Sequence, residues 1–266
     1  MTVTHNYCLG MLLGIDIGNS NVVIGCWSDD QWLHVWRLPT LVQEDSLIFY
    51  QTRLRSLLLD AGINHSDLND IVISTVVPDL AQPFTELSAR LTGQPPILVN
   101  AGWYHLLKFD TESPSEMGSD LFANAIAANR MLRSDCIIID FGTALTFTTL
   151  TAEGLIRGVA IAPGLKTAMG ALYQKTAQLP EVPLELPRSV LGTNTQHAIQ
   201  SGVLIGYVGL VKHMVSTIRE ETGAHYKTIA TGGLSSILHP LSSSFDMVDP
   251  HLTLNGLRLI AEANHA

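Results

Sequence analysis

Two segments of the chain repeat one pattern: an apolar strand, an Asp-x-Gly turn and a second apolar strand. The first lies at residues 12–27 around Asp16, and the second at residues 136–150 around Asp140. The two aspartates are 124 residues apart, close to half of the 266-residue chain. A repeat of one such large unit predicts a duplicated domain and argues against a solenoid of short repeats.

The segments that follow each hairpin alternate between strand and helix patterns. Gly62 and Pro78 mark two boundaries, because glycine commonly follows a helix and proline stops a buried strand. We expect an α/β fold of two lobes around a cleft, each a mixed sheet flanked by helices, at residues 11–125 and 126–266. Residues 1–10 are expected to be a loose extension. Further strands are expected at 32–38, 71–77, 96–99, 155–161 and 227–230, and helices at 44–61, 80–92, 119–133, 165–176, 195–221 and 252–264.

Composition narrows the class of protein. The chain is 46% hydrophobic and only 15% charged, with a net charge of −9 and no lysine- or arginine-rich run, so sequence-independent nucleic-acid binding is not expected. No secretory signal and no uninterrupted apolar run of membrane-spanning length is evident, which predicts a soluble cytoplasmic protein without a membrane partner. Cys8, Cys26 and Cys136 form no CxxC pair, so buried free thiols are expected.

The first turn, Asp16-Ile-Gly-Asn-Ser-Asn21, combines a carboxylate with a glycine and small polar residues. Glycine lets the backbone approach a phosphate closely, and the polar residues can donate hydrogen bonds to its oxygens. A carboxylate beside phosphates requires a bridging cation or the water shell of one, so Asp16 also predicts a metal ion. Taken alone, the segment is equally consistent with an ordinary hairpin turn.

The second turn, Asp140-Phe-Gly-Thr143, repeats this arrangement with Thr143 as a hydroxyl donor. Two such hairpins facing each other would hold a triphosphate and its metal, and the pair is more specific than either turn. Thr231-Gly-Gly-Leu-Ser235 follows a strand, and its glycine pair would let a phosphate or a flat group lie against the backbone. A tight strand–helix turn is the alternative there.

Gly118-Ser-Asp-Leu121 opens the helix expected at 119–133 and places Asp120 in its first turn. The residue is either a capping acid or a base that accepts a hydroxyl proton during phosphoryl transfer. The positive end of the helix dipole is expected to keep its carboxylate ionised and weakly basic. Residues 191–195 and 201–202 add neutral donors near helix starts, suited to an amide or a carboxylate.

Taken together, these segments resemble the type III pantothenate kinase family from about Leu12 to Asn264. The first hairpin is similar to that family's Asp-x-Gly-Asn-(Thr/Ser)-Asn motif, and Asp140-Phe-Gly-Thr-Ala144 to its second phosphate motif. Each further segment is weak alone, but the set occurs in the family's order: Ser74–Pro78, Leu179-Pro180, Gly192–Thr195, Gln200–Gly202, Thr231–Leu234 and Leu252–Leu257.

The resemblance implies an actin-like ATPase fold, duplicated from RNase H-like domains, and ATP-dependent phosphorylation of pantothenate, the first step of coenzyme A biosynthesis. It implies a homodimer with substrate near the interface, Mg²⁺ with Asp16, directly or through water, and K⁺ or NH₄⁺ beside Asp140. Asp120 matches the proton acceptor. The expected nucleotide contacts are Asp16, Ile17, Gly18, Asn19, Ser20, Asn21, Val22, Val23, Thr143, Gly232 and Gly233. The expected substrate contacts are Gly118, Ser119, Asp120, Leu121 and Thr195.

One position departs from the family pattern: Leu121 stands where arginine is expected. That arginine would suit the pantothenate carboxylate, and a lost charge-assisted contact costs about 1.5–3 kcal/mol. A nucleotide-binding regulatory relative with weak or no kinase activity is therefore the alternative. A kinase or phosphatase of the same superfamily acting on a sugar or polyphosphate is a third hypothesis, which the short chain disfavours.

Overall fold

The computed structural model describes residues 10–233 and 239–265. It divides into unit 1 (Met1–Leu106, Ser113–Ala127 and Thr253–Ala266) and unit 2 (Leu107–Glu112 and Ala128–Leu252). Most of the expected N-terminal extension, Cys8 and the end of the Thr231–Ser235 motif lie outside the described residues.

The sheet of unit 1 has the strand order β3-β2-β1-β4-β5. Its first three strands form an antiparallel meander, and β4 and β5 run parallel to β1. Asp29 and Asp30, both at positive φ, make the β2–β3 turn. The strands are β1 (Met11–Ile17), β2 (Asn21–Ser28), β3 (Gln31–Pro39), β4 (Leu68–Thr75) and β5 (Ile97–Leu98).

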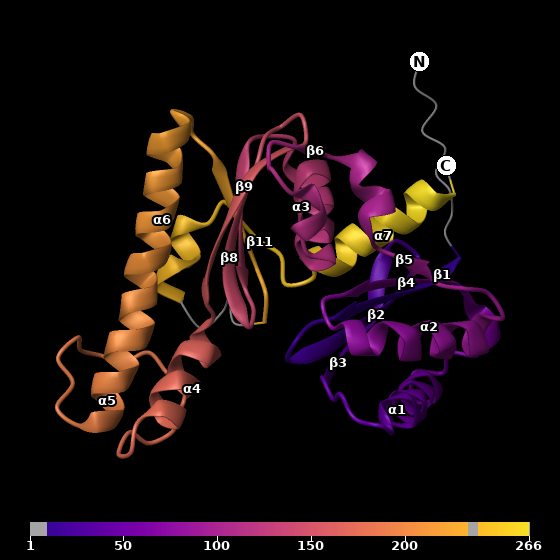
Figure 1. Ribbon diagram of the computed structural model, residues 1–266, viewed down its shortest axis with the longest axis horizontal. Coiled ribbons are helices and arrows are strands. Elements are labelled where there is room, and N and C mark those ends of the chain that lie inside the picture. Colours follow the sequence, from indigo (N-terminus) through magenta and orange to yellow (C-terminus); the bar gives the residue numbers. More distant parts are fainter. Residues whose placement is uncertain (1–9, 234–238, 266) are drawn as a thin grey trace. The chain divides into compact units, whose positions relative to one another are not determined.

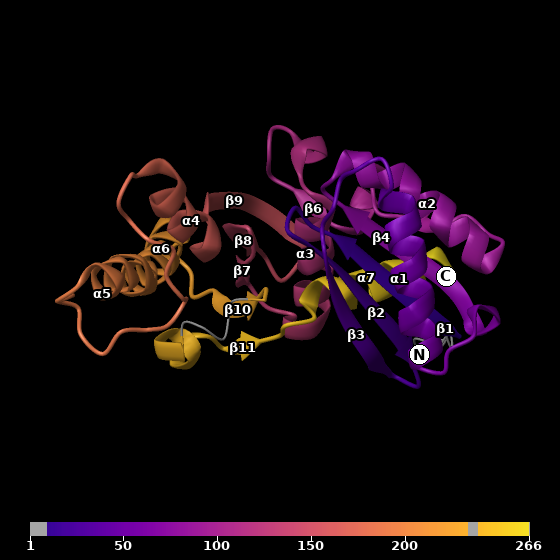
Figure 2. The same ribbon diagram turned by 90° about the horizontal axis from the view of Figure 1, so that it is seen from below.

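Helices cover both faces of this sheet (Figures 1 and 2). On one face, α1 (Ser46–Asp60) and α2 (Pro78–Thr92) bury Tyr50 and Phe84 in the core. Gly62 follows α1 at φ +70°, as the sequence predicts for a residue just past a helix. Short 3₁₀ segments complete the connections of the chain: His65–Asp67, Ala101–Leu106, Pro114–Glu116 and, in unit 2, His239–Ser244.

The C-terminal helix α7 (Leu252–Asn264) covers the other face of the unit 1 sheet, although the sequence placed it with the second half. Trp32 Nε1 donates a hydrogen bond to Asn255 Oδ1 (2.9 Å). Gly25 gives the helix room, since a Cβ there would lie 2.8 Å from Leu254. The observed units therefore differ from contiguous lobes at the C-terminal helix, which belongs to unit 1, and at Leu107–Glu112, which belongs to unit 2.

Unit 2 repeats the strand arrangement of unit 1, in the order β11-β10-β7-β8-β9-β6. Strands β7, β8 and β9 form an antiparallel meander, and β10 runs parallel to β7 as β4 runs parallel to β1. The predicted duplicated α/β fold is confirmed. The strands are β6 (Lys108–Phe109), β7 (Cys136–Phe141), β8 (Ala144–Leu150), β9 (Leu155–Pro163), β10 (Lys227–Thr231) and β11 (Met247–Val248).

Helices of unit 2 pack on one face of its sheet through Leu165, Leu204, Tyr207 and Val211. They are α4 (Leu165–Lys175), α5 (Thr195–Gln200), a π-helical turn (Ser201–Ile205) and α6 (Gly206–Thr222), while α3 (Ser119–Leu132) crosses the division between the units.

The continuous helical run Thr195–Thr222 is, by length and composition alone, apolar enough to cross a membrane. Its mean hydropathy is 1.3, and only 33% of its most apolar stretch is buried. A core helix of a soluble protein passes the same test, so one such helix is weak evidence for a span. The low burial means that much of this helical run is not covered by the residues that the structure describes.

We predict that Gly256→Ala destabilises the protein by about 1–3 kcal/mol, the usual cost of overpacking. Its Cβ would lie 1.9 Å from the Ala123 carbonyl oxygen, so α7 would have to move away from α3. Urea unfolding measures the change. Gly170→Ala in α4 is the matched control, because no atom lies within 4 Å of its Cβ position. Equal effects of the two substitutions would contradict the packing described here.

Candidate active site

The first Asp-x-Gly turn of unit 1 is held in place by the end of β3. Gly18 N–H donates to the Asn21 carbonyl (3.0 Å), which closes the turn. Thr40 donates through its hydroxyl to the Gly18 carbonyl (2.6 Å) and through its N–H to the Ser20 carbonyl (3.1 Å). Asn19 and Ser20 are exposed at the tip of the turn.

The predicted contact residues of this hairpin differ in what they can offer a ligand. Ile17 and Val22 are fully buried in the core, so only their main-chain atoms could contact a nucleotide. Asp16 is half-buried and stands beside Val23 and Ser74 in the strand register.

Ser119 anchors the start of α3 to the end of β4. Its hydroxyl donates to the Thr75 carbonyl (3.0 Å) and accepts from the Thr75 N–H (3.0 Å), and it lies 2.9 Å from the Ser74 hydroxyl. Because Ser74 pairs with Asp16, the same edge of the sheet carries both Asp16 and Asp120. The Ser119 side chain is buried and used for this anchoring, so a substrate contact there would involve its main chain.

Asp120 occupies a confined position in the first turn of α3. Its Oδ1 accepts a hydrogen bond from the Leu121 N–H (2.8 Å). Gly118 makes room for it, since a Cβ on that residue would lie 2.5 Å from Asp120 Oδ1. Burial raises the pKa of the Asp120 carboxyl and outweighs the backbone hydrogen bonds that lower it. The raised pKa contradicts the expectation of a weakly basic carboxylate, because desolvation exceeds the effect of the backbone hydrogen bonds.

Tyr104 is a neighbour of Asp120 that the sequence analysis missed. Its hydroxyl donates to the Met117 carbonyl (2.6 Å), directly before Gly118, and its ring packs 4.8 Å from that of Phe122. Burial and, secondarily, the charge of Asp120 raise the pKa of Tyr104. No motif surrounds this residue, so only the three-dimensional structure reveals its place.

In unit 2, Asp140 lies in a row of oxygen-bearing side chains across three strands. The register pairs Thr231 with Asp140 and Asp140 with Thr146. Thr146 Oγ1 is buried and has no hydrogen-bond partner among the described residues. Gly232 has φ +90°, and a Cβ there would lie 2.5 Å from Asp140 Oδ1, so only glycine fits beside this carboxylate. A carboxylate with adjacent hydroxyls suits a hard cation, which prefers oxygen ligands.

The turn at Thr143 is fixed by the start of α4. Gly164 N–H (2.9 Å) and Thr167 Oγ1 (2.6 Å) both donate to the Thr143 carbonyl. The Thr143 side chain itself is exposed. Thr195, the remaining predicted substrate contact, is exposed at the first position of α5, after the N-cap Asn194 whose Oδ1 accepts from the His197 N–H (2.9 Å).

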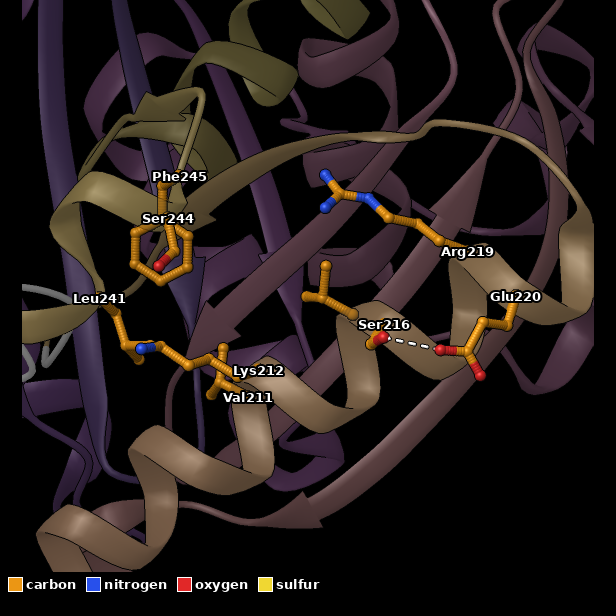
Figure 3. A pocket seen from close by; sticks show the side chains of 9 residues that line it. Val211, Lys212, Ser216, Arg219, Glu220, Leu241, Ser244 and Phe245 are labelled. Carbon is orange, nitrogen blue, oxygen red and sulfur yellow. Dashed lines mark hydrogen bonds between the residues drawn. The ribbon is translucent and has the colours of Figure 1, made fainter.

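A pocket of about 420 Å³ lies between α6 and the 3₁₀ segment His239–Ser244 of unit 2 (Figure 3). Three of its polar side chains have partners: Ser216 donates to Glu220 (2.8 Å), and Arg219 donates to the Tyr226 carbonyl (2.6 Å). No predicted site residue lines it. The pocket therefore does not mark the site expected from the sequence.

No group of three or more His, Cys, Asp or Glu side chains able to hold a metal ion occurs among the described residues. Asp16 offers a single carboxylate, which suits Mg²⁺, because that ion keeps several waters and binds substrate phosphates. Cys26 and Cys136 are free and buried, as predicted, and burial raises their pKa values to about 11 and about 12. Such thiols are unreactive.

Comparison with known proteins identifies the family. The sequence model of type III pantothenate kinases matches residues 12–217. The chain is 39% identical over 255 residues to a type III pantothenate kinase of Dehalococcoides mccartyi strain 195, covering 96% of this chain and 98% of that protein. This chain belongs to the type III pantothenate kinase family.

A second relative and a solved structure agree with this assignment. A type III pantothenate kinase of Roseiflexus sp. is 39% identical over 260 residues, covering 96% of this chain and all of that protein. The crystal structure of MreB 5 of Spiroplasma citri bound to AMPPNP superposes with a TM-score of 0.56 at 8% identity, over 96% of this chain and 97% of that one. That likeness shows the fold alone, and it supports the actin-like architecture that the family implies.

We predict that Ser119→Ala destabilises this family member by about 1–3 kcal/mol, because it leaves buried groups of Ser74 and Thr75 without their partner. Denaturant unfolding measures the loss. Ser56→Ala on the exposed surface of α1, where the hydroxyl contacts only Asp60 at 3.5 Å, serves as the control and is expected to change stability by less than about 0.5 kcal/mol. An unchanged midpoint for Ser119→Ala would refute the anchoring role.

Proposed function

We propose that this chain transfers the γ-phosphoryl group of ATP to the primary hydroxyl of pantothenate, giving 4'-phosphopantothenate and ADP. The product would enter coenzyme A biosynthesis. The observation that carries the proposal is a half-buried carboxylate, Asp120, held by the Leu121 N–H at the start of α3 in a chain of this family, with a pKa raised by desolvation. Its position matches the family's proton acceptor residue by residue.

Asp120 acts as the general base in this mechanism. Its carboxylate takes the proton of the acceptor hydroxyl as that oxygen bonds to the γ-phosphorus. The bond from phosphorus to the β,γ-bridging oxygen breaks, and ADP leaves with the electron pair. Because phosphoryl transfer depends mostly on positioning and charge stabilisation, the fixed carboxylate matters as much as its basicity. Gly118 and the Leu121 N–H hold it in one orientation.

The hairpins hold the nucleotide and its cations in this proposal. The exposed tip at Asn19 and Ser20 donates hydrogen bonds to phosphate oxygens, as do Thr143 and the backbone at Gly232 and Gly233. Asp16 binds Mg²⁺, directly or through water. Bound Mg²⁺ would neutralise phosphate charge. Asp140, with Thr146 and Thr231, supplies oxygen ligands for K⁺ or NH₄⁺, supported by the buried, unpartnered hydroxyl of Thr146.

The proposal is tested by measuring ADP release from the purified protein with ATP, Mg²⁺ and K⁺. Release is expected to require pantothenate and to fall when K⁺ is replaced by Na⁺. Formation of phosphopantothenate, checked by mass spectrometry, would exclude the regulatory alternative. Stabilisation by ATP without any phosphorylated product would instead support that alternative and overturn the kinase proposal.

We predict that Asp120→Asn lowers turnover by at least about 100-fold, the usual contribution of a general base. The same change is expected to raise the melting temperature at pH 7.5. A carboxyl whose pKa is raised on folding stabilises the fold at pH values below its unfolded pKa. That contribution is lost as pH rises through the folded pKa. At pH 7.5 the ionised Asp120 therefore lowers the stability of the fold, and the neutral asparagine does not. Calorimetry and steady-state kinetics measure both effects.

The pH profile of the unmodified protein is the companion measurement. The acid limb of kcat is expected above the ordinary aspartate pKa of about 3.9, because the base must be deprotonated to act. A fully active Asp120→Asn variant, or one of lower thermal stability, would contradict the assigned role or the burial effect respectively.

We further propose a cytoplasmic homodimer that covers the outer face of the run Thr195–Thr222. Gly202, Gly206 and Gly209 recur on this face at helical spacing and are exposed, and nothing lies within 4 Å of their Cβ positions. Val190 (65% exposed) and Leu191 (81%) add apolar surface beside this run, where Ser201 donates a hydrogen bond to the Val190 carbonyl. Such apolar surface is typical of a contact between subunits. Thr195, at the start of this run, would then contact substrate near the interface.

We predict that Gly206→Arg separates this dimer into monomers, because a long charged side chain prevents close helix packing. Light scattering after gel filtration is expected to give twice the 28.9 kDa chain mass for the unmodified protein and the single mass for the variant. Ser56→Arg on α1 is the control and is expected to stay dimeric. A monomeric unmodified protein would exclude the interface.

A further inference from the structure

The first Asp-x-Gly turn is closed by the residue that follows the third strand of its meander. Strand β3 ends at Pro39, which pairs with Asn21 at the start of β2. Proline has no N–H to donate to the ladder, and it is found on edge strands such as β3. The next residue, Thr40, donates its N–H to the Ser20 carbonyl (3.1 Å), so the end of β3 determines where the turn lies.

Unit 2 repeats this closure position by position. Strand β9 also ends at a proline, Pro163, which pairs with Ala144 at the start of β8. The next residue, Gly164, donates its N–H to the Thr143 carbonyl (2.9 Å). Thr143 precedes β8 as Ser20 precedes β2. The duplication therefore extends beyond the Asp-x-Gly motifs to the residues that close the two turns.

Each of these proline carbonyls accepts a hydrogen bond from a buried tyrosine on a helix. Tyr50 of α1 donates to the Pro39 carbonyl (3.1 Å) and accepts from the Leu41 N–H (2.8 Å), so it bonds on both sides of the residue that closes the turn. Tyr207 of α6 donates to the Pro163 carbonyl (2.6 Å). Burial raises the pKa of both tyrosine hydroxyls, so both keep the proton that they donate.

Different parts of the chain supply the two tyrosines. Tyr50 lies 11 residues beyond Pro39, whereas Tyr207 lies 44 residues beyond Pro163. A buried tyrosine hydroxyl needs a partner wherever it lies, and Tyr226 of unit 2 finds one in an arginine side chain. The first two tyrosines nevertheless bond the same carbonyl of the repeat through different connections. This coincidence indicates that the bond matters for holding the turn.

We propose that Tyr50 and Tyr207 are a pair of positioning residues for nucleotide binding, each fixing one Asp-x-Gly turn through the proline carbonyl at the end of the third strand. This rests on the proposed kinase function, in which both turns donate hydrogen bonds to phosphate oxygens. Hydrogen bonds depend steeply on angle and distance, and a turn that is already fixed has no ordering cost to meet when the nucleotide binds. A turn that is free to shift therefore loses affinity although every contact residue is present.

The test measures the dissociation constant of a non-hydrolysable ATP analogue by calorimetry, with Mg²⁺ and K⁺ present. Tyr50→Phe and Tyr207→Phe keep the ring and remove the hydroxyl. Each is expected to raise the dissociation constant at least about fivefold, equivalent to about 1 kcal/mol. The double variant is expected to multiply the two effects, because the tyrosines have no shared partner. Tyr226→Phe, which removes a buried tyrosine hydroxyl elsewhere in unit 2, is the control and should leave the constant unchanged.

Hydrogen exchange of the nucleotide-free protein separates positioning from general stability. The Gly18 and Gly142 N–H groups each close a turn with a 3.0 Å hydrogen bond, so their exchange reports on the turn itself. Each is expected to exchange at least about tenfold faster in the variant of its own unit, as local opening does, while the turn of the other unit is little changed. A purely structural role would instead speed exchange throughout the chain in proportion to the lost stability, and that result would overturn the inference.

Steady-state kinetics separates this inference from the kinase proposal. The variants are expected to raise KM for ATP and keep kcat within about twofold, because they weaken binding alike in the ground and transition states. An unchanged dissociation constant in either tyrosine variant, with phosphorylated product from the unmodified protein, would overturn the inference and leave the kinase function intact. Weaker binding in both variants of a protein that forms no product would overturn the kinase function and keep the inference. If the unmodified protein does not bind the analogue, both proposals fall. All measurements are made below the melting temperature of the least stable variant.

Discussion

The position of the proposed base depends on one hydroxyl group. Ser119 accepts from and donates to the backbone of Thr75 and contacts Ser74, so the first turn of α3 is joined to the end of β4. Strand β4 in turn lies beside β1, which leads into the first hairpin. The first Asp-x-Gly turn and the proposed base thereby lie at the same end of one sheet, although about a hundred residues separate them in the sequence. Ser119 therefore positions the adjacent Asp120 through its own hydrogen bonds to β4.

This anchoring also explains the unusual chemistry of Asp120. A carboxylate at a helix start normally gains stability from exposed N–H groups and the helix dipole. Here Ser119 holds the helix start against the end of β4, and Tyr104 of the 3₁₀ segment Ala101–Leu106 lies near Asp120. The carboxylate is partly removed from water, and the cost of this desolvation exceeds the stabilisation from its backbone hydrogen bonds. Burial raises the proton affinity of this carboxylate and makes its ionised form less favourable in the folded protein. The same contacts that orient the base therefore tune its proton affinity.

The sequence predicted most elements of the fold, for identifiable reasons. The expected strands and helices agree with the observed ones to within a few residues, because Gly62, Pro78 and the two Asp-x-Gly hairpins mark clear boundaries. Helix α7 was predicted at its observed bounds. The two-residue strands β6 and β11 carry no periodic pattern and were missed, whereas β5 was expected at 96–99. The packing of α7 on the first sheet was missed too, because it depends on the space left by Gly14 and Gly25 and on Asn255 meeting Trp32 across 223 residues. Residue types pointed to Asp120, but its proton affinity follows from burial, which no local pattern records.

The charge distribution bears on both nucleotide binding and the proton affinity of Asp120. ATP is an anion, and the hairpin at Asp16 offers it a carboxylate and main-chain donors in a unit without lysine. Phosphate binding in such a unit relies on backbone N–H groups and bound cations, which can leave with the nucleotide. A resident arginine beside Asp120 would stabilise an acceptor carboxylate, but it would also lower the proton affinity that burial gives the base. Leucine at position 121 introduces no such charge, so the raised proton affinity that burial gives Asp120 is kept.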